Sequence, residues 1–147
     1  GSFAVVCTIF LMLATFAAFL DFDAAKSFQG LILIPVFSRF ASSFCVFSCK
    51  PMQTSQYASG FAAAQNKRQL TALAILNVLA AVLGLLLLPR PWFTVCALGA
   101  EGFALLCCFL ARKNLGGMSG DISGFSMTLG EAAGLLLLLA GQEGLCI

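Results

Sequence analysis

Five long apolar runs dominate this sequence and constrain its fold more than any other feature. They cover approximately residues 3–20, 28–48, 70–88, 92–111 and 122–140. A helix needs roughly 20 mostly apolar residues to cross the hydrocarbon core of a bilayer. Only 10% of the residues are charged, whereas soluble domains carry about 25%. The sequence therefore predicts an all-α fold, a polytopic membrane helical bundle of about five transmembrane helices, with residues 1–147 forming a single membrane domain.

Two polar loops, at about residues 49–69 and 112–121, fall on the same side of the membrane if the five runs span it alternately. The basic residues on that side are Lys50, Lys67, Arg68, Arg112 and Lys113. The opposite side holds only Lys26 and Arg90. Because Lys and Arg are enriched in cytoplasmic loops, we expect both polar loops to be cytoplasmic and the protein to be a multi-pass protein of the cytoplasmic (inner) membrane.

Composition excludes several functional classes. Histidine is absent, which removes Ser-His and Cys-His nucleophile pairs and histidine metal sites. The seven cysteines form no CxxC pair and lie mostly in apolar runs, where a thiol behaves as a small hydrophobic group. A net charge of +2 without a basic tract predicts no nucleic-acid partner. The chain starts at Gly1-Ser2 with apolar sequence following at once, so we expect either an added Gly-Ser remnant or a missing N-terminal portion.

Residues 116–124 form a polar, glycine-dense run directly before the last apolar run. Its glycines allow backbone N–H groups to turn toward a ligand and approach it closely. Asp121 in the same run is a carboxylate of the kind that binds Mg²⁺ beside phosphate oxygens. The run therefore predicts a phosphate- or metal-binding loop at a helix N-terminus. The alternative is a flexible loop between helices, capped by Asp121.

A stripe of residues in the last run could line a site. Asp121, Gly124, Thr128 and Glu131 are spaced three, four and three residues apart, which places them on one helix face. Glu131 lies about 15 Å deeper than Asp121 at 1.5 Å per residue. An ionisable group at such depth is costly and faces a partner or a water-filled cavity. Close helix packing is the competing explanation for the glycines of this run.

Three further residues inside the runs need partners. Arg39 cannot lose its proton, so it must pair, extend to the interface or face water. Two interpretations stay open for it: an ion pair with Glu101 or Glu131, or a contact with a phosphate, whose geometry suits a guanidinium group. Glu101 is interpreted first as a packing or pairing residue, and Asn77 as a donor between helices. Gly130 and Gly134 are expected to serve helix packing.

Two segments resemble the C-terminal portion of the cobalamin synthase family, also called adenosylcobinamide-GDP ribazoletransferase. One is LGGMSGDISG at residues 115–124, followed by LGE at 129–131, and the other is the dipeptide Ser38-Arg39 after Pro35. The resemblance covers essentially the whole chain and is most specific over residues 113–131 and at Ser38-Arg39.

The resemblance implies a Mg²⁺-dependent membrane enzyme. Such an enzyme transfers the cobinamide-phosphate moiety of adenosylcobinamide-GDP to α-ribazole, or to its 5′-phosphate, and releases GMP. Asp121 would be the catalytic residue and a Mg²⁺ ligand. The residues expected to bind substrate or its phosphates are Ser38, Arg39, Lys67, Lys113, Gly116, Gly117, Ser119, Gly120, Gly124 and Glu131. The expected partners are these substrates, the lipid bilayer, and a missing N-terminal half or other cobalamin-assembly proteins.

The chain also departs from the family pattern. The family's first half carries an Asp-rich motif of the DGLADTxDG type, which no segment here matches. We expect the main metal site to lie in that motif, so that this chain holds part of the active site. Ser119 replaces a Thr, Phe125 an Ala, and Thr128 a Glu. The missing motif and the intramembrane charges leave an alternative function open, a non-catalytic membrane scaffold or a transporter of small solutes.

Overall fold

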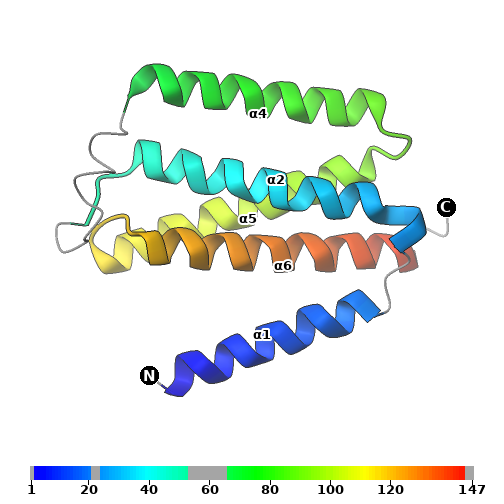
Figure 1. Ribbon diagram of the computed structural model, residues 1–147, viewed down its shortest axis with the longest axis horizontal. Helices are drawn as coiled ribbons and strands as arrows, with labels where there is room; N and C mark the ends of the chain where they lie inside the picture. The colour runs from blue at the N-terminus through cyan, green and yellow to red at the C-terminus, as the bar shows by residue number, and fades with distance from the viewer. Residues whose placement is uncertain (1, 21–23, 53–65, 145–147) are drawn as a thin grey trace.

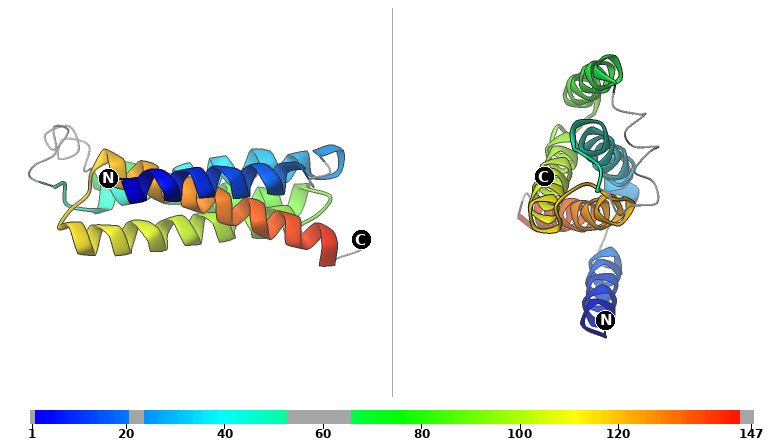
Figure 2. Two further views of the ribbon diagram at one scale, coloured as in Figure 1. Left: turned by 90° about the horizontal axis from the view of Figure 1, so that it is seen from below. Right: turned by 90° about the vertical axis from the view of Figure 1, so that its left-hand side faces the viewer.

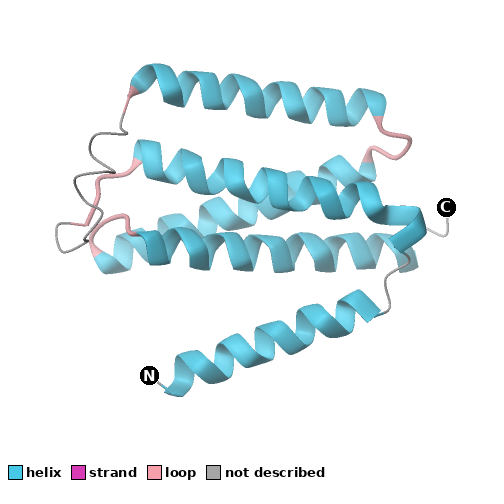
Figure 3. Ribbon diagram, in the orientation of Figure 1, coloured by secondary structure: helices cyan, strands magenta, loops and turns pink. Residues whose placement is uncertain are grey.

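The computed structural model describes residues 2–20, 24–52 and 66–144, which form five α-helices (Figure 1). The helices are α1 (Ser2–Leu20), α2 (Ala24–Ser48), α4 (Lys67–Leu87), α5 (Trp92–Leu115) and α6 (Gly120–Gly144). In this part of the chain the only β-type pairing is one isolated bridge, so the ribbon consists of helices and loops (Figure 3). The predicted all-α fold with five helices is confirmed.

Four of these helices are long and apolar enough to cross a membrane. The segments are Ser27–Ser48, Lys67–Leu87, Trp92–Leu115 and Gly120–Gly141. They coincide with the second to fifth predicted spans. In α1 the apolar helical segment found among the described side chains is the shorter Thr8–Ala17, so a span by α1 stays a prediction.

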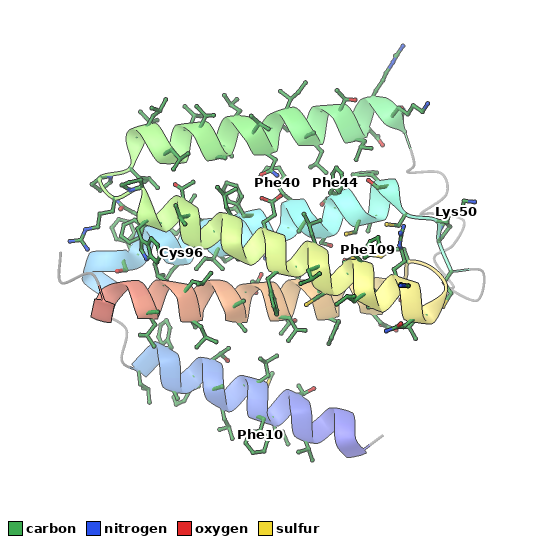
Figure 4. All side chains as sticks on the ribbon, turned by 180° about the vertical axis from the view of Figure 1, so that it is seen from behind. Phe10, Phe40, Phe44, Lys50, Cys96 and Phe109 are labelled. Carbon is green, nitrogen blue, oxygen red and sulfur yellow. The ribbon has the colours of Figure 1, made fainter. Side chains whose placement is uncertain are left out.

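Helices α2, α5 and α6 form the packed centre of the bundle (Figure 2). Buried apolar side chains join them in a core, which includes Phe37 of α2, Phe93 and Ala97 of α5, and Leu138 of α6. On one side of this centre α4 packs against α2 and α5, and on the other side α1 packs against α6. Most apolar side chains of α1 and α4 are exposed, and Phe10 lies on the outer side of α1 (Figure 4). These two helices therefore present apolar surface suited to lipid.

Glycine and alanine allow α5 and α6 to approach closely. A Cβ atom on Gly130 would lie 2.7 Å from the Cβ of Ala104 and 2.8 Å from the carbonyl oxygen of Ala100. A Cβ atom on Gly134 would lie 2.7 Å from the Cβ of Ala100. Small residues at such contacts are typical of membrane helix pairs. The packing role predicted for Gly130 and Gly134 is confirmed.

The C-terminal ends of α2 and α5 and the N-terminal ends of α4 and α6 lie together at one end of the bundle (Figure 1). The five basic residues of the two predicted polar loops are therefore at a common end, and Lys50 is seen there (Figure 4). The predicted loop bounds were too wide. Arg112 and Lys113 belong to the last turn of α5, where cations stabilise the helix dipole, and Lys67 begins α4. Residues 53–65 of the first polar loop lie outside the described residues.

Candidate functional site

The turn between α5 and α6 explains two of the four conspicuous glycines through backbone geometry. Gly116 ends α5 with a φ of 80°, in the left-handed region that glycine adopts most easily, and its N–H donates to the carbonyl of Arg112 over 2.9 Å. A Cβ atom on Gly117 would lie 2.8 Å from the Cα of Met52. Gly116 is thus needed for the turn, and Gly117 for the close approach of a second chain segment.

That second segment follows α2 and is tied to the turn by two backbone hydrogen bonds. The N–H of Met118 donates to the carbonyl of Lys50 over 2.9 Å, and the N–H of Met52 donates to the carbonyl of Met118 over 2.8 Å. Next to them a buried cluster, which includes Cys45, Cys108, Met118 and Ile122, packs between α2, α5 and the start of α6. The turn before α6 is therefore bonded through its backbone to the segment after α2. The alternative of a flexible loop stays a prediction.

Ser119 caps the start of α6, where Asp121 was the predicted cap. The hydroxyl oxygen of Ser119 accepts a hydrogen bond from the N–H of Ile122 at 3.4 Å, and its carbonyl accepts from the N–H of Ser123 at 3.1 Å. Asp121 lies exposed in the first turn, where a carboxylate interacts favourably with the helix dipole. The side chain of Asp121 therefore does not cap the helix and is exposed on the protein surface.

Gly120 and Gly124 differ from the other glycines of this region. A Cβ atom on either residue would have no heavy atom of the described residues within 4 Å, leaving out its chain neighbours and the nearby helix backbone. Neither has a positive φ among the described residues. Turn geometry and helix packing therefore do not account for glycine at these two positions. The open surface beside them leaves room for a ligand to approach the α6 backbone.

A second group of predicted site residues meets about midway along the length of α2 and α6. The hydroxyl of Ser38 donates to Oε1 of Glu131 over 2.8 Å, and a guanidinium nitrogen of Arg39 donates to the same oxygen over 2.7 Å. The same guanidinium nitrogen also donates to the carbonyl of Pro35 over 3.1 Å. Ser38 is buried, whereas the side chains of Arg39 and Glu131 are 62% and 36% exposed. Of the two partners predicted for Arg39, Glu131 is the one it binds.

Two serines continue this polar strip toward the turn. The hydroxyls of Ser42 in α2 and Ser123 in α6 are hydrogen-bonded to each other, one turn of α2 closer to the glycine turn than Ser38. Ser126 lies buried beside them and donates to the carbonyl of Ser123 over 2.9 Å. None of these three serines was predicted as a site residue, although Ser42 follows Ser38 at helical spacing. Together these side chains form a polar track between α2 and α6, whereas Asp121 is exposed in the first turn of α6 and contacts none of them in the described structure.

Glu101 and Asn77 form a separate polar contact between α4 and α5. The side-chain amide of Asn77 donates to Oε1 of Glu101, which is only 7% exposed. The expectation that Asn77 bonds between helices and that Glu101 serves pairing is confirmed. The sequence could not distinguish Glu101 from Glu131 as the partner of Arg39, because both lie near mid-span.

The structure does not unite all predicted site residues. Asp121 and Glu131 are ten residues apart on α6, about 15 Å along its axis, so one phosphate group cannot contact both. Lys67 lies at the same end of the bundle as Asp121, but α4 makes no contact with α6 in the described part. Lys113 is exposed in the last turn of α5. The predicted residues thus form an outer group around Asp121 and a deeper group around Arg39.

The donor set does not form a complete metal site. Among the residues that the structure describes, no group of three His, Cys, Asp or Glu side chains could hold a metal ion. A Mg²⁺ site uses one or two carboxylates together with phosphate oxygens and water. Asp121 fits the role of one such carboxylate, and the remaining ligands would have to come from substrate, water or another polypeptide segment.

Comparison with known proteins agrees with the resemblance drawn from the residues. Residues 1–139 match the CobS family, described as cobalamin-5-phosphate synthase. The chain belongs to this family. An adenosylcobinamide-GDP ribazoletransferase of Clostridium perfringens (strain 13 / Type A) is 30% identical over 140 residues, which cover 94% of this chain and 55% of the relative. The enzyme of the same name from Clostridium botulinum (strain Alaska E43 / Type E3) is 28% identical over 138 residues, 92% of this chain and 54% of the relative.

The chain therefore spans about half the length of these curated relatives. No solved structure matches it significantly. Of the residues on which the resemblance rested, the structure brings Ser38, Arg39 and Glu131 into direct contact, while Asp121 lies apart at the start of α6.

Proposed function

We propose that this chain forms part of the active site of an adenosylcobinamide-GDP ribazoletransferase. In the reaction, a hydroxyl of α-ribazole, or of its 5′-phosphate, attacks the phosphorus atom bonded to the cobinamide. A new P–O bond forms, the bond to the GMP oxygen breaks, and the hydroxyl proton passes to a base. Family membership and the activity named for the relatives support this proposal. The observation that carries it is the pairing of Ser38 and Arg39 with Glu131 between α2 and α6, together with the exposed Asp121 at the start of α6.

The outer group would perform the transfer. Asp121 is an exposed carboxylate in the first turn of α6, and it can accept the proton of the attacking hydroxyl. Gly120 and Gly124 leave the α6 surface open beside it, which allows a phosphate to approach the backbone. The N-terminus of α6 favours negative charge because its first N–H groups lack helical partners. Lys113, at the end of α5, would add a cation for the phosphate oxygens.

The deeper group would hold another part of the substrates. Ser38 and Arg39 offer donors that suit phosphate or sugar oxygens. Glu131 fixes Arg39 through the 2.7 Å contact, while the wide exposure of Arg39 leaves further N–H groups for a ligand. Lys67 stays a proposed phosphate contact from the same end of the bundle.

Mg²⁺ belongs to the proposal as well. When bound, it would neutralise charge on the transferred phosphate and the leaving group. Asp121 would supply one ligand, and the others would come from outside the described residues. We further propose that the basic end of the bundle faces the cytoplasm, since five Lys and Arg residues gather there.

Replacing Asp121 by Asn tests the proposal in a protein of the relatives' full length that carries this chain. GMP release and cobalamin formation are expected to fall by about 10²–10⁴-fold, the usual contribution of a general base. Glu101→Gln serves as the control, because Glu101 bonds to Asn77 away from the track. Activity of the Asp121 variant close to that of the parent would remove this residue from the mechanism. Transport of a solute by a protein that forms no product would instead favour the transporter.

A further inference from the structure

We propose that the outer face formed by α2 and α6 around Arg39 and Glu131 is a docking surface. Its occupant would be one or more transmembrane helices of the portion of the family that this chain does not match. The inference concerns assembly and stands independently of the proposed chemistry. We call this surface the Arg39 face, and it comprises Ile32, Val36, Arg39, Phe125, Thr128 and Glu131.

A charged pair, Arg39 and Glu131, is exposed at membrane depth. Arg39 is the thirteenth residue of the 22-residue span Ser27–Ser48, and Glu131 is the twelfth of the 22-residue span Gly120–Gly141. Both therefore lie near mid-span. Yet the two side chains are 62% and 36% exposed in the described structure. Ionisable groups at that depth face the interior of a bundle or a water-filled cavity and not lipid.

The other polar pair of the bundle, Asn77 and Glu101, differs in its burial. Glu101 is 7% exposed, and Asn77 satisfies it from the neighbouring helix. The chain thus covers one mid-span carboxylate with its own helices and leaves the other uncovered. In the described part of the chain none of the other helices covers both α2 and α6 on this side. Helix α4 does not contact α6, α1 contacts α6 but not α2, and α5 packs on the inner side of both.

The Arg39 face combines apolar residues with a small polar centre. Ile32, Val36 and Phe125 are exposed apolar residues that surround the ion pair and Thr128. An apolar surface around a small number of polar groups suits packing against another membrane helix, which can also hydrogen-bond to the centre. The flanking helices α1 and α4 also carry exposed apolar residues, but no ion pair is found on them among the described residues.

The length of the relatives identifies the occupant. The matched residues make up 55% of the Clostridium perfringens relative, so the family carries almost as much sequence again. That remaining portion is present wherever a protein of full family length is made, on the same polypeptide or on a second one. Docking it against the Arg39 face would also cover Arg39 and Glu131, the two exposed side chains next to buried Ser38.

Site-directed photo-crosslinking in membranes tests the proposal. The complete 147-residue chain would be produced together with the unmatched portion of the Clostridium perfringens relative as a separate, tagged polypeptide. A benzoylphenylalanine would replace Val36 or Thr128 on the Arg39 face, and Leu86 of α4 or Phe10 of α1 as lipid-facing controls. We expect crosslinks to the tagged polypeptide from Val36 and Thr128, and none from the control positions Leu86 and Phe10.

Three outcomes would overturn the inference: crosslinks from Val36 and Thr128 to lipid alone, crosslinks to a second copy of this chain, or equal crosslinking from Leu86. The same experiment on an Asp121→Asn background separates docking from catalysis. Crosslinking that persists while activity is lost supports both proposals. Crosslinking that persists while the Asp121→Asn protein retains full activity supports docking and refutes the catalytic role of Asp121.

Discussion

Replacing Gly130 by Ala tests the helix packing that positions the polar track. The added Cβ would lie 2.7 Å from the Cβ of Ala104 and 2.8 Å from the carbonyl oxygen of Ala100. Non-bonded carbon atoms prefer separations of about 3.5–4.0 Å. Helices α5 and α6 would therefore have to separate locally by about 1 Å. Overpacking of this kind costs typically about 1–3 kcal/mol.

Gly124→Ala is the matched control on the same helix. Among the described residues, a Cβ at Gly124 would meet no heavy atom within 4 Å outside its own neighbourhood in the helix. Both substitutions gain the same helix propensity, about 0.8–1.0 kcal/mol from glycine to alanine in soluble hosts. The difference between Gly130→Ala and Gly124→Ala therefore isolates the packing clash. Gly124→Ala should be neutral or stabilising, and Gly130→Ala less stable than it by about 1–3 kcal/mol.

Equilibrium unfolding in detergent micelles, followed by the helical circular dichroism signal, measures the two variants side by side. Equal unfolding free energies would refute the close α5–α6 contact at Gly130. The two variants should also differ in activity when they are placed in a protein of the relatives' full length. There Gly124→Ala is expected to lower activity with no loss of stability, because the added methyl group occupies the open surface beside Asp121.

Three further predictions follow from single contacts. Glu131→Gln leaves Arg39 without its charge partner and should lower the unfolding free energy by about 1–3 kcal/mol. A double variant with Arg39→Leu should cost less than the sum of the two single changes, and strict additivity would contradict the ion pair. Asn77→Leu removes the donor to buried Glu101 and should cost about 1–3 kcal/mol, which Asn77→Leu combined with Glu101→Leu should restore in the same unfolding assay. Gly117→Ala should speed hydrogen exchange of the two amides that tie the turn to the segment after α2, and unchanged exchange would refute that tie.

The apolar runs were sufficient to predict the helices of this fold. Each run is long enough to span a bilayer, and a bilayer forces the backbone to satisfy its own hydrogen bonds, so helices were the expected result. Errors were confined to the helix ends. Arg112 and Lys113 are polar and were assigned to a loop, but they extend α5 because cations are favourable at a helix C-terminus.

The candidate site was predictable only in part. Arg39 and Glu131 stand out because charged residues are rare in these runs, Asp121 because it lies in the glycine-dense run, and Ser38 through the family resemblance. The serine pair that completes the track was missed, because serine is common in membrane helices and its partner lies 81 residues away in sequence. A contact between residues so distant along the chain has no local signal.

The sequence by itself determined the membrane class, the helices and the family, and it singled out the candidate site residues. It could do so because these depend on local composition and on short motifs. Only the tertiary structure decided which acid pairs with Arg39, and it separated the glycines by role. Gly116, Gly117, Gly130 and Gly134 serve the turn and the packing, whereas Gly120 and Gly124 face open surface. That distinction depends on which atoms surround each Cα, and those atoms come from helices far apart in the chain.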